Sequence, residues 1–267
     1  MNFKTKLDIT RKNNNSLLCI GLDPDPKLLP IDDIALFNKE IIDATKDLVC
    51  CYKPNLAFYE SLGITGLKAL EETLSYIPND IPVIGDAKRG DIGSTAQAYA
   101  KALFDVWCFD AATVNPYLGK DSLDPFIEYK EKGVFILCHT SNPGASDFQE
   151  LNIQSESSTH TLFEQIAEKS ESWNIHDNIG LVVGATYPEQ MKIIRGICPT
   201  MPILAPGIGA QGGDLKSTVD YGLTNDHTGL IINSSRGIIY ASDDKMDFAS
   251  KARAAADKLR ISINSHI

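Results

Sequence analysis

The sequence predicts an α/β protein in which one closed (β/α)8 barrel, a TIM barrel, takes up the whole chain, residues 1–267. Two observations lead to this prediction. Short apolar runs recur roughly every 30 residues, the spacing of strand–helix units, and segments with helical periodicity lie between them. No linker rich in Gly or Ser and no shift in composition divides the chain, so we expect a single domain.

Eight apolar runs are the predicted strands, because a parallel strand that is covered on both faces is apolar along its length. They span residues 17–22, 48–52, 82–85, 111–114, 134–138, 179–183, 203–205 and 230–232. An open doubly wound sheet would show the same alternation of strands and helices. Eight alternating units favour the closed barrel over the open sheet.

Apolar residues spaced by three or four positions predict helices between these strands. The first such stripe consists of Ile34, Phe37, Ile41, Ala44 and Leu48. Asp32 or Asp33 is placed to cap the start of that helix. A second stripe, near the end of the chain, consists of Phe248, Ala252, Ala255 and Leu259. The alanine-rich segment after Gly93 also favours a helix.

Composition excludes several classes of partner. Lys and Arg number 25 against 35 Asp and Glu, a net charge of −10, so we expect no general nucleic-acid binding. No run of about 18 apolar residues is present, and no membrane association is expected. The first residues, MNFKTKLDIT, lack a signal-peptide core, and the six cysteines form no C-x-x-C pair, which together predict a cytoplasmic protein.

Residues suited to a site follow seven of the eight apolar runs. Six of these runs are followed by polar side chains, namely Asp23, Lys53, Asp86, Lys88, Asn115, Thr140, Ser141, Asn233 and Arg236, and the run 203–205 is followed by Pro206-Gly207. The C-terminal ends of barrel strands converge on one face, where the active sites of such barrels lie. We therefore expect one site at this face.

The densest of these clusters is Asp86-Ala87-Lys88, with Lys53 expected on the neighbouring strand. Residues two apart on a strand point to the same side, so Asp86 and Lys88 are expected to share a pocket with Lys53. Opposite charges that lie close together keep each other ionised. A structural ion-pair network without chemistry is the alternative, but the cost of burying charges favours a function.

A glycine-rich segment, PGIGAQGGD at residues 206–214, follows the seventh run. In a barrel, the loops after strands seven and eight commonly bind phosphate through backbone N–H groups. Arg236 is placed to add a bidentate charge there. The position after strand seven argues against a dinucleotide-binding fingerprint. A glycine-rich turn without a ligand is the alternative interpretation.

Tight metal binding is not indicated, because the five histidines show no metal-ligand spacing and no H-E-x-x-H, EF-hand or P-loop pattern occurs. Loose binding of Mg²⁺ by pairs of Asp stays open. The polar stretch 141–160 predicts a mobile loop after the fifth strand, which we expect to close over a ligand.

Taken together, these segments resemble the orotidine 5′-phosphate decarboxylase family, and its longer bacterial branch in particular. Residues 86–92, DAKRGDI, are similar to the family's D-x-K-x-x-D-I motif, and residues 206–214 to its phosphate loop. Residues 233–236, NSSR, are similar to its strand-eight arginine segment. Two further segments, GLDP at 21–24 and NPYLG at 115–119, are similar to the bacterial branch. The resemblance covers nearly the whole chain.

The resemblance implies decarboxylation of orotidine 5′-monophosphate to UMP and CO₂, the last step of de novo pyrimidine synthesis, by a homodimer without a cofactor. It implies that Lys88 donates a proton to C6 of the pyrimidine, with Lys53 and Asp86 beside it. The residues implied to enter the partner's site are Asp91, Ile92 and Thr95. The residues implied to bind substrate are Asp23 at the ribose, Ser141 and Gln211 at the base and phosphate, and Arg236 at the phosphate, with Pro206 and Gly237 also contacting substrate.

The charged cluster suits this chemistry, because loss of CO₂ leaves an electron pair at C6 that a fixed ammonium stabilises and protonates. Three alternatives stay open at this point. One is a Mg²⁺-dependent sugar-phosphate decarboxylase or aldol-type synthase on the same barrel. The others are a Schiff-base aldolase that uses Lys53 or Lys88, and a barrel that only binds a ligand.

Overall fold

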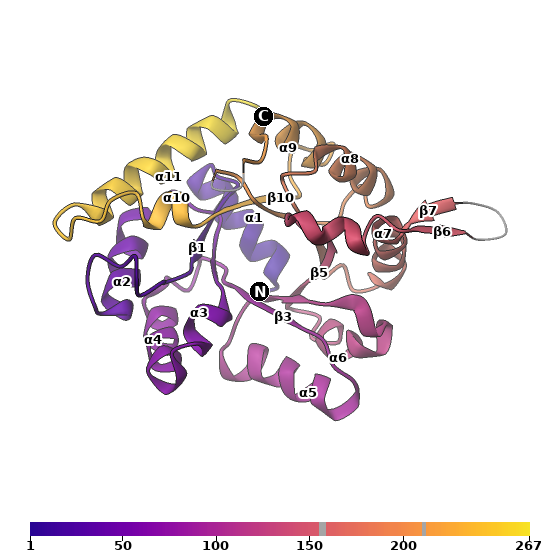
Figure 1. Ribbon diagram of the computed structural model, residues 1–267, viewed down its shortest axis with the longest axis horizontal. Helices are drawn as coiled ribbons and strands as arrows, with labels where there is room; N and C mark the ends of the chain where they lie inside the picture. The colour runs from indigo at the N-terminus through magenta and orange to yellow at the C-terminus, as the bar shows by residue number, and fades with distance from the viewer. Residues whose placement is uncertain (155–158, 210–211) are drawn as a thin grey trace.

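Eight parallel strands form one sheet in the computed structural model, which describes residues 1–154, 159–209 and 212–267 (Figure 1). The strands are β1 (Leu18–Leu22), β2 (Cys51–Pro54), β3 (Ile84–Arg89), β4 (Ala111–Val114), β5 (Gly133–His139), β8 (Ile179–Val183), β9 (Ile203–Pro206) and β10 (Leu230–Ser234). Their order is β2-β1-β10-β9-β8-β5-β4-β3. Parallel bridges between Tyr52 and Val83 and between Asn55 and Asp86 join the two ends of the sheet. The predicted closed barrel is therefore confirmed, and each predicted apolar run overlaps one strand.

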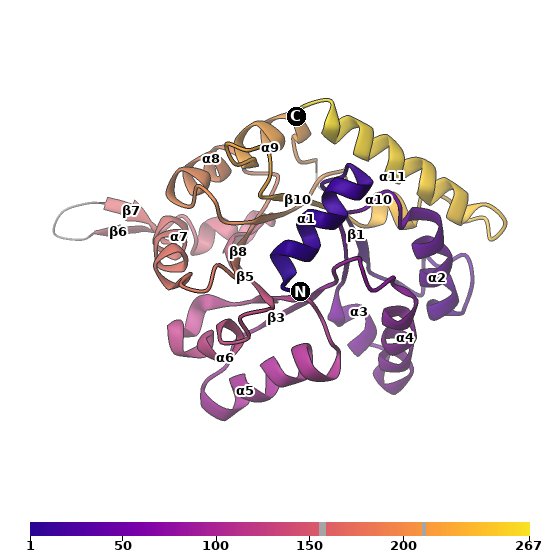
Figure 2. The same cartoon turned by 180° about the vertical axis from the view of Figure 1, so that it is seen from behind.

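Helices surround the strands on the outside of the barrel (Figures 1 and 2). They are α2 (Ile34–Thr45), α3 (Leu56–Glu60), α4 (Gly63–Tyr76), α5 (Gly93–Lys101), α6 (Asp124–Ile127), α7 (Leu162–Trp173), α8 (Pro188–Ile197), α9 (Leu215–Gly222), α10 (Arg236–Ile239) and α11 (Phe248–Asn264). A π-helical turn, η1 (Ala102–Val106), continues α5, and the 3₁₀ turns η2 (Pro116–Leu118) and η3 (Lys120–Ser122) follow β4. Of the two caps predicted for α2, Asp33 is used, and its carboxylate accepts from the Leu36 N–H at 2.9 Å.

The first helix, α1 (Phe3–Asn14), was not anticipated from the sequence. It lies across the barrel on the side seen in Figure 2. Phe3 and Leu7 are buried, and the Phe3 ring packs edge-on against Phe135 with centroids 5.6 Å apart. The helix thus covers the N-terminal end of the barrel and leaves the opposite end for a site.

Two apolar clusters alternate along the strands. Leu18 and Ile20 face the helices, whereas Cys19 between them points into the barrel, where it packs in one cluster with Phe135 and Leu204. Since strand side chains alternate, the next inward position along each strand lies one layer closer to the C-terminal end. At that layer the inward residues include Lys53, Asp86, Thr113 and Asn233, all buried. An apolar interior layer therefore supports a polar one.

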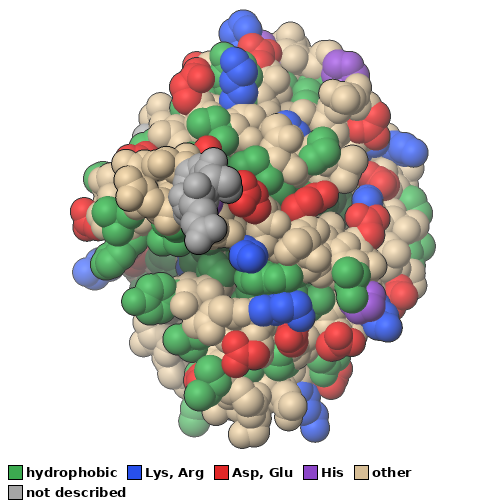
Figure 3. Space-filling view, turned by 90° about the vertical axis from the view of Figure 1, so that its right-hand side faces the viewer, with side chains coloured by type: hydrophobic (Ala, Val, Ile, Leu, Met, Phe, Trp, Pro, Cys, Tyr) green, Lys and Arg blue, Asp and Glu red, His purple; other side chains and the backbone are tan. Residues whose placement is uncertain are grey.

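Within the predicted loop 141–160, the described residues form a 3₁₀ turn, η4 (Pro143–Asp147), and two short strands, β6 (Asn152–Gln154) and β7 (Thr159–Thr161). These strands pair antiparallel and project from the side of the barrel (Figure 1). On the face that includes this hairpin, acidic and basic side chains are interspersed with hydrophobic ones (Figure 3). Closure of the loop stays a prediction.

Among the helices of the described residues, none is both long enough and apolar enough to cross a membrane.

Candidate active site

A cavity of about 600 Å³ opens at the C-terminal ends of the strands. Eight of the predicted site residues line it: Asp23, Lys53, Asp86, Lys88, Ser141, Pro206, Arg236 and Gly237. The register of the barrel brings them together, because Gly21 pairs with Lys53 and Asn233 pairs with Pro206 on neighbouring strands. The side chains expected at this face therefore lie around the same cavity.

Asp86 is the centre of the charged cluster. Its Oδ2 accepts from Lys53 Nζ at 2.9 Å, and its Oδ1 accepts from Lys88 Nζ at 2.6 Å and from Thr113 Oγ1 at 2.8 Å. Asp86 is 8% exposed and Lys53 4% exposed. The Lys88 side chain is about half exposed, at 47%, so it is the member of the cluster that reaches into the open cavity.

The cluster holds its members in their charged forms. Burial acts to raise the pKa of Asp86, but the ammonium groups of Lys53 and Lys88 outweigh it and hold that pKa well below its usual range. Burial acts to lower the pKa of Lys53, but Asp86 and Asp23 reverse the effect and raise it well above its usual value. A buried carboxylate and a buried ammonium are therefore both maintained at neutral pH.

Lys88 has a left-handed backbone conformation, with φ of 48°. The pairing of β3 with β4 shifts between Gly85 and Arg89, so β3 is not a regular strand at this point. The predicted proximity of Lys88 and Asp86 is present, but regular strand alternation does not produce it. The Lys88 N–H donates to Thr113 Oγ1 at 3.0 Å, and this bond helps to hold a conformation that costs a non-glycine residue about 1 kcal/mol or more.

Asp23 is fixed at the other side of Lys53. Its Oδ1 accepts from the Asn55 N–H at 3.1 Å, and its Oδ2 accepts from the Ser235 hydroxyl. A Cβ at Gly21 would lie 2.1 Å from Ser235 Oγ, so glycine at this position leaves room for the Ser235 side chain. Asp23 is held at the cavity wall with a fixed orientation.

The glycine-rich segment lies at the cavity as predicted. Pro206, Gly207 and Ile208 line it, and Gly207 and Gly209 have φ of 109° and 87°, which favour glycine. Arg236, at the start of α10, also lines the cavity, and in the described part of the chain it forms no ion pair with a carboxylate. Gln211 lies outside the described residues.

Three predicted residues, Asp91, Ile92 and Thr95, do not line this cavity. The Asp91 carboxylate accepts from the Ile92 N–H at 2.8 Å, and Ile92 is 59% exposed. Among the contacts of the described residues, Lys88 pairs with Asp86 and not with Asp91. Within one chain, the Asp–Lys–Asp arrangement expected from the sequence thus lacks its second carboxylate.

Sequence reasoning missed several residues of the site. Thr113 bonds both the Asp86 carboxylate and the Lys88 backbone, and as the one polar residue in the run 111–114 it carried a usable signal. Asn55 and Gln149 also line the cavity. No comparable signal marked Gln149, because it reaches the cavity from within the long polar stretch.

A metal centre is not apparent in the ranges that the structure describes, where no group of three or more His, Cys, Asp or Glu side chains is placed to hold an ion.

Comparisons with known proteins find relatives along nearly the whole chain. The sequence model of the orotidine 5′-phosphate decarboxylase / HUMPS family matches residues 16–250. An orotidine 5′-phosphate decarboxylase from Dehalococcoides mccartyi (strain BAV1) is 52% identical over 267 residues, which is 100% of this chain and 98% of the relative.

Solved structures agree as well. The Leishmania donovani OMP decarboxylase superposes with a TM-score of 0.88 at 42% identity, covering 100% of this chain and 98% of that one. The UMP synthase of the same organism superposes with a TM-score of 0.90 at 44% identity over 100% of this chain, which spans 56% of the length of that longer chain.

Proposed function

The chain belongs to the orotidine 5′-phosphate decarboxylase / HUMPS family, and we infer that it is a carboxy-lyase that converts orotidine 5′-monophosphate to UMP and CO₂ in pyrimidine biosynthesis. The observation that carries this function is the Lys53–Asp86–Lys88 cluster, which lies in the same cavity as the glycine-rich segment and Arg236. The cavity can therefore bind a phosphate at one side and present an ammonium to a reacting carbon at the other.

The reaction needs a fixed positive charge beside C6 of the pyrimidine. When the bond between C6 and the carboxylate breaks, CO₂ leaves and the electron pair stays on C6. The Lys88 ammonium, held by Asp86 at 2.6 Å, stabilises that negative charge as it develops. The Lys88 Nζ then gives a proton to C6, which forms the C6–H bond of UMP. Its half-exposed side chain regains a proton from solvent.

Lys53 and Asp86 prepare this step. Lys53 stabilises the Asp86 carboxylate by donating to its Oδ2, and Asp86 in turn fixes the direction of the Lys88 side chain through its Oδ1. A substrate carboxylate placed near Asp86 would be repelled, and loss of CO₂ relieves that repulsion. The cluster therefore favours the transition state over the bound substrate.

Substrate binding is distributed around the cavity wall. Arg236, Gly237 and the backbone at Pro206 bind the phosphate, together with Gln211. Asp23 accepts hydrogen bonds from the ribose hydroxyls, and Ser141 contacts the base. Binding energy from the phosphate, remote from C6, helps to organise the site around the reacting atoms.

A second copy of the chain completes the site in this proposal. The backbone just before Asp91, Ile92 and Thr95 contacts the segment after β4, since a Cβ at Gly90 would lie 2.7 Å from the Asn115 carbonyl oxygen. Exposed apolar side chains gather on these two segments, with Ile92 at 59% and Tyr117 at 82%. Such a surface suits a homodimer in which each chain supplies Asp91, Ile92 and Thr95 to its partner's cavity.

The decisive assay follows the ultraviolet absorbance of orotidine 5′-monophosphate with purified protein. We expect the orotate absorbance to be lost, and Lys88→Ala to abolish turnover while binding of UMP is largely retained. No spectral change at high enzyme concentration would reject the function, and a near-normal rate for Lys88→Ala would remove Lys88 from the mechanism.

A Mg²⁺-dependent sugar-phosphate decarboxylase or aldol-type synthase is not favoured, since relatives about half identical over their whole length are named orotidine 5′-phosphate decarboxylase. EDTA tests the point directly. Activity on orotidine 5′-monophosphate should persist in the chelator, whereas loss of activity that Mg²⁺ restores would favour the alternative.

Mixing two inactive variants tests the shared site. Equal amounts of Lys88→Ala and Asp91→Ala chains, once exchanged, should recover part of the activity, because one of the two cavities in each mixed dimer is then intact. If exchange is verified and no activity returns, each cavity is built from one chain. The cytoplasm stays our prediction for the compartment; all six cysteines are free thiols.

A further inference from the structure

His139, the last residue of β5, is a buried side chain that the proposed chemistry does not use. It is 0% exposed, and its ring packs edge-on against Phe163 and Tyr187, with centroids 5.2 and 4.5 Å away. Its Nε2 lies 3.2 Å from Glu150 Oε1. Because a carboxylate only accepts, Nε2 carries the proton and donates. The buried Nδ1 has no partner in the described residues, so the side chain directs its polar contact at Glu150.

Glu150 connects His139 to a second element and to the loop that follows β5. Its Oε1 also accepts from Gln190 Nε2, on α8, at 3.1 Å. The preceding residue, Gln149, accepts from the Thr140 N–H at 2.8 Å through its Oε1 and donates to Thr140 Oγ1 at 2.9 Å through its Nε2. Residues 149 and 150 thus pair back on residues 140 and 139 and close the base of the loop.

Ser141 lies immediately inside this closed base and lines the cavity. Its carbonyl accepts from Thr186 Oγ1 at 3.2 Å. On the other side, a Cβ at Gly184 would lie 2.6 Å from Ser141 Cα, so the backbone of the two segments is in direct contact. The position of Ser141 is therefore determined by its neighbours and not by its own side chain.

We propose that the His139–Glu150 contact is a positioning device for substrate binding, which holds Ser141 at the cavity by closing the base of the loop after β5. This inference rests on the proposed function, because Ser141 matters only if it contacts the substrate. Neither His139 nor Glu150 lines the cavity, so in this proposal both act through Ser141.

The test compares the kinetics of three variants with those of the unaltered enzyme. Glu150→Ala removes the acceptor of the His139 and Gln190 hydrogen bonds, and we expect KM for orotidine 5′-monophosphate to rise about tenfold with kcat changed less. Glu150→Gln keeps an acceptor oxygen and should restore most of the affinity. Glu189→Ala removes an exposed carboxylate next to Gln190 and should leave both constants unchanged.

The separate effects on KM and kcat distinguish a positioning role of Glu150 from a role in folding. A purely structural loss would reduce the fraction of active enzyme and lower the apparent kcat at an unchanged KM. A double-mutant cycle then asks whether Glu150 acts through Ser141. Ser141→Ala should raise KM, and adding Glu150→Ala to it should have little further effect.

Several results would overturn the inference. They are a KM for Glu150→Ala within twofold of the unaltered value, a fall in kcat alone, a Glu150→Gln variant as impaired as Glu150→Ala, or an effect of Glu150→Ala that persists in full in Ser141→Ala. Should Glu150→Ala not fold, Gln190→Ala, which loosens Glu150 from α8, must show a smaller rise in KM. Absence of activity in the unaltered enzyme would instead reject the proposed function, so the two failures are distinguishable.

Discussion

Removing the charge of Asp86 is the sharpest test of the site's electrostatics. Asp86→Asn keeps the size of the side chain but leaves the Lys53 ammonium, 4% exposed, without its adjacent carboxylate. Breaking a buried ion pair by removing one partner costs about 3–5 kcal/mol, because the remaining charge stays buried without compensation. We expect urea denaturation at pH 7 to show a loss of this size, together with a fall in kcat of roughly a hundredfold or more.

The stability difference between the unaltered protein and Asp86→Asn should depend on pH in one direction. The pKa of Asp86 is depressed in the folded protein, so its contribution is present above the unfolded value, about 3.9, and is lost as the pH falls through the folded value. The stability difference between the unaltered protein and Asp86→Asn should therefore be flat from about pH 5 to 8 and shrink in more acidic solution. A difference that grows towards acid would contradict the reasoning.

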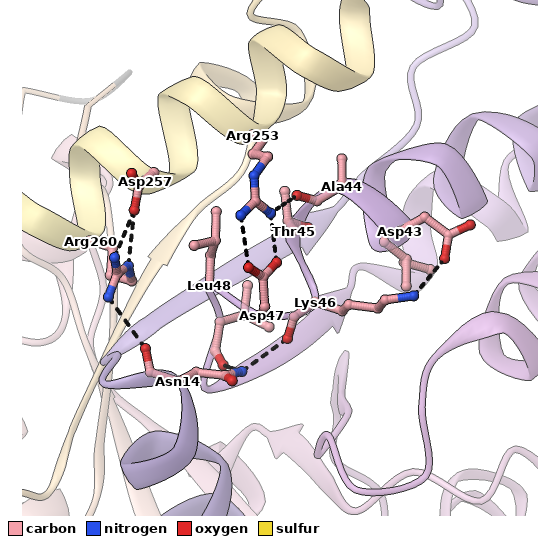
Figure 4. A network of polar contacts seen from close by, with 12 residues as sticks. Asn14, Asp43, Ala44, Thr45, Lys46, Asp47, Leu48, Arg253, Asp257 and Arg260 are labelled. Atoms are coloured by element: carbon pink, nitrogen blue, oxygen red, sulfur yellow. Dashed lines mark hydrogen bonds and ion pairs between the residues drawn. The ribbon is translucent and has the colours of Figure 1, made fainter.

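Asp43 provides a matched control on the surface. Its carboxylate also accepts from two lysines, Lys39 at 2.7 Å and Lys46 at 3.0 Å, but the side chain is 47% exposed (Figure 4 shows Lys46 and Asp43). Because water screens exposed pairs, Asp43→Asn should cost less than about 1 kcal/mol. If Asp86→Asn also costs less than about 1 kcal/mol, burial does not make the cluster special and the argument fails.

Three further predictions concern the site wall, a partly buried arginine and an exposed ion pair. Gly21→Ala should raise KM severalfold, because the new Cβ would lie 2.1 Å from Ser235 Oγ and displace the hydroxyl that bonds Asp23; an unchanged KM would show that Asp23 is not held in this way. Arg195→Met should lower the free energy of unfolding, measured with urea, by roughly 3 kcal/mol or more. The partly buried Arg195 guanidinium donates to the backbone carbonyls of residues 198, 201, 222 and 229, and these hydrogen bonds would be lost. Burial also lowers the pKa of Arg195 to about 10. Arg253→Ala should lower stability by less than about 1 kcal/mol, because its pairing with the Asp47 oxygens at 2.6 and 2.7 Å is exposed (Figure 4), and 1 M salt should shrink the difference.

The strands could be predicted well from the sequence because burial on both faces leaves a strong local signal. Runs 111–114 and 179–183 coincide with β4 and β8, and the charged residues at the strand ends entered the cavity as expected. The helix α1 could not be predicted in the same way. Few of its residues are buried, among them Phe3 and Leu7, so its sequence reads as polar although it covers the end of the barrel.

Site residues could be predicted where the chemistry of one side chain identifies them. They could not be predicted where their role depends on contacts between residues far apart in the sequence. Asp86, Lys88 and Lys53 stood out because charges follow apolar runs. The contact between His139 and Glu150 did not stand out, because it forms only when the loop after β5 folds back and brings residue 150 beside residue 139. The backbone of Lys88 is a similar case, since its φ of 48° accompanies a shift in the pairing of β3 with β4.

By itself, the sequence determined which side chains could form a charged cluster and which backbone could approach a phosphate, because ionisable groups and glycines are local properties of the chain. Only the tertiary structure decided that Lys53, Asp86 and Lys88 meet within hydrogen-bonding distance while Asp91 points elsewhere. That outcome depends on barrel closure and strand register, which are set by packing between residues far apart in the chain.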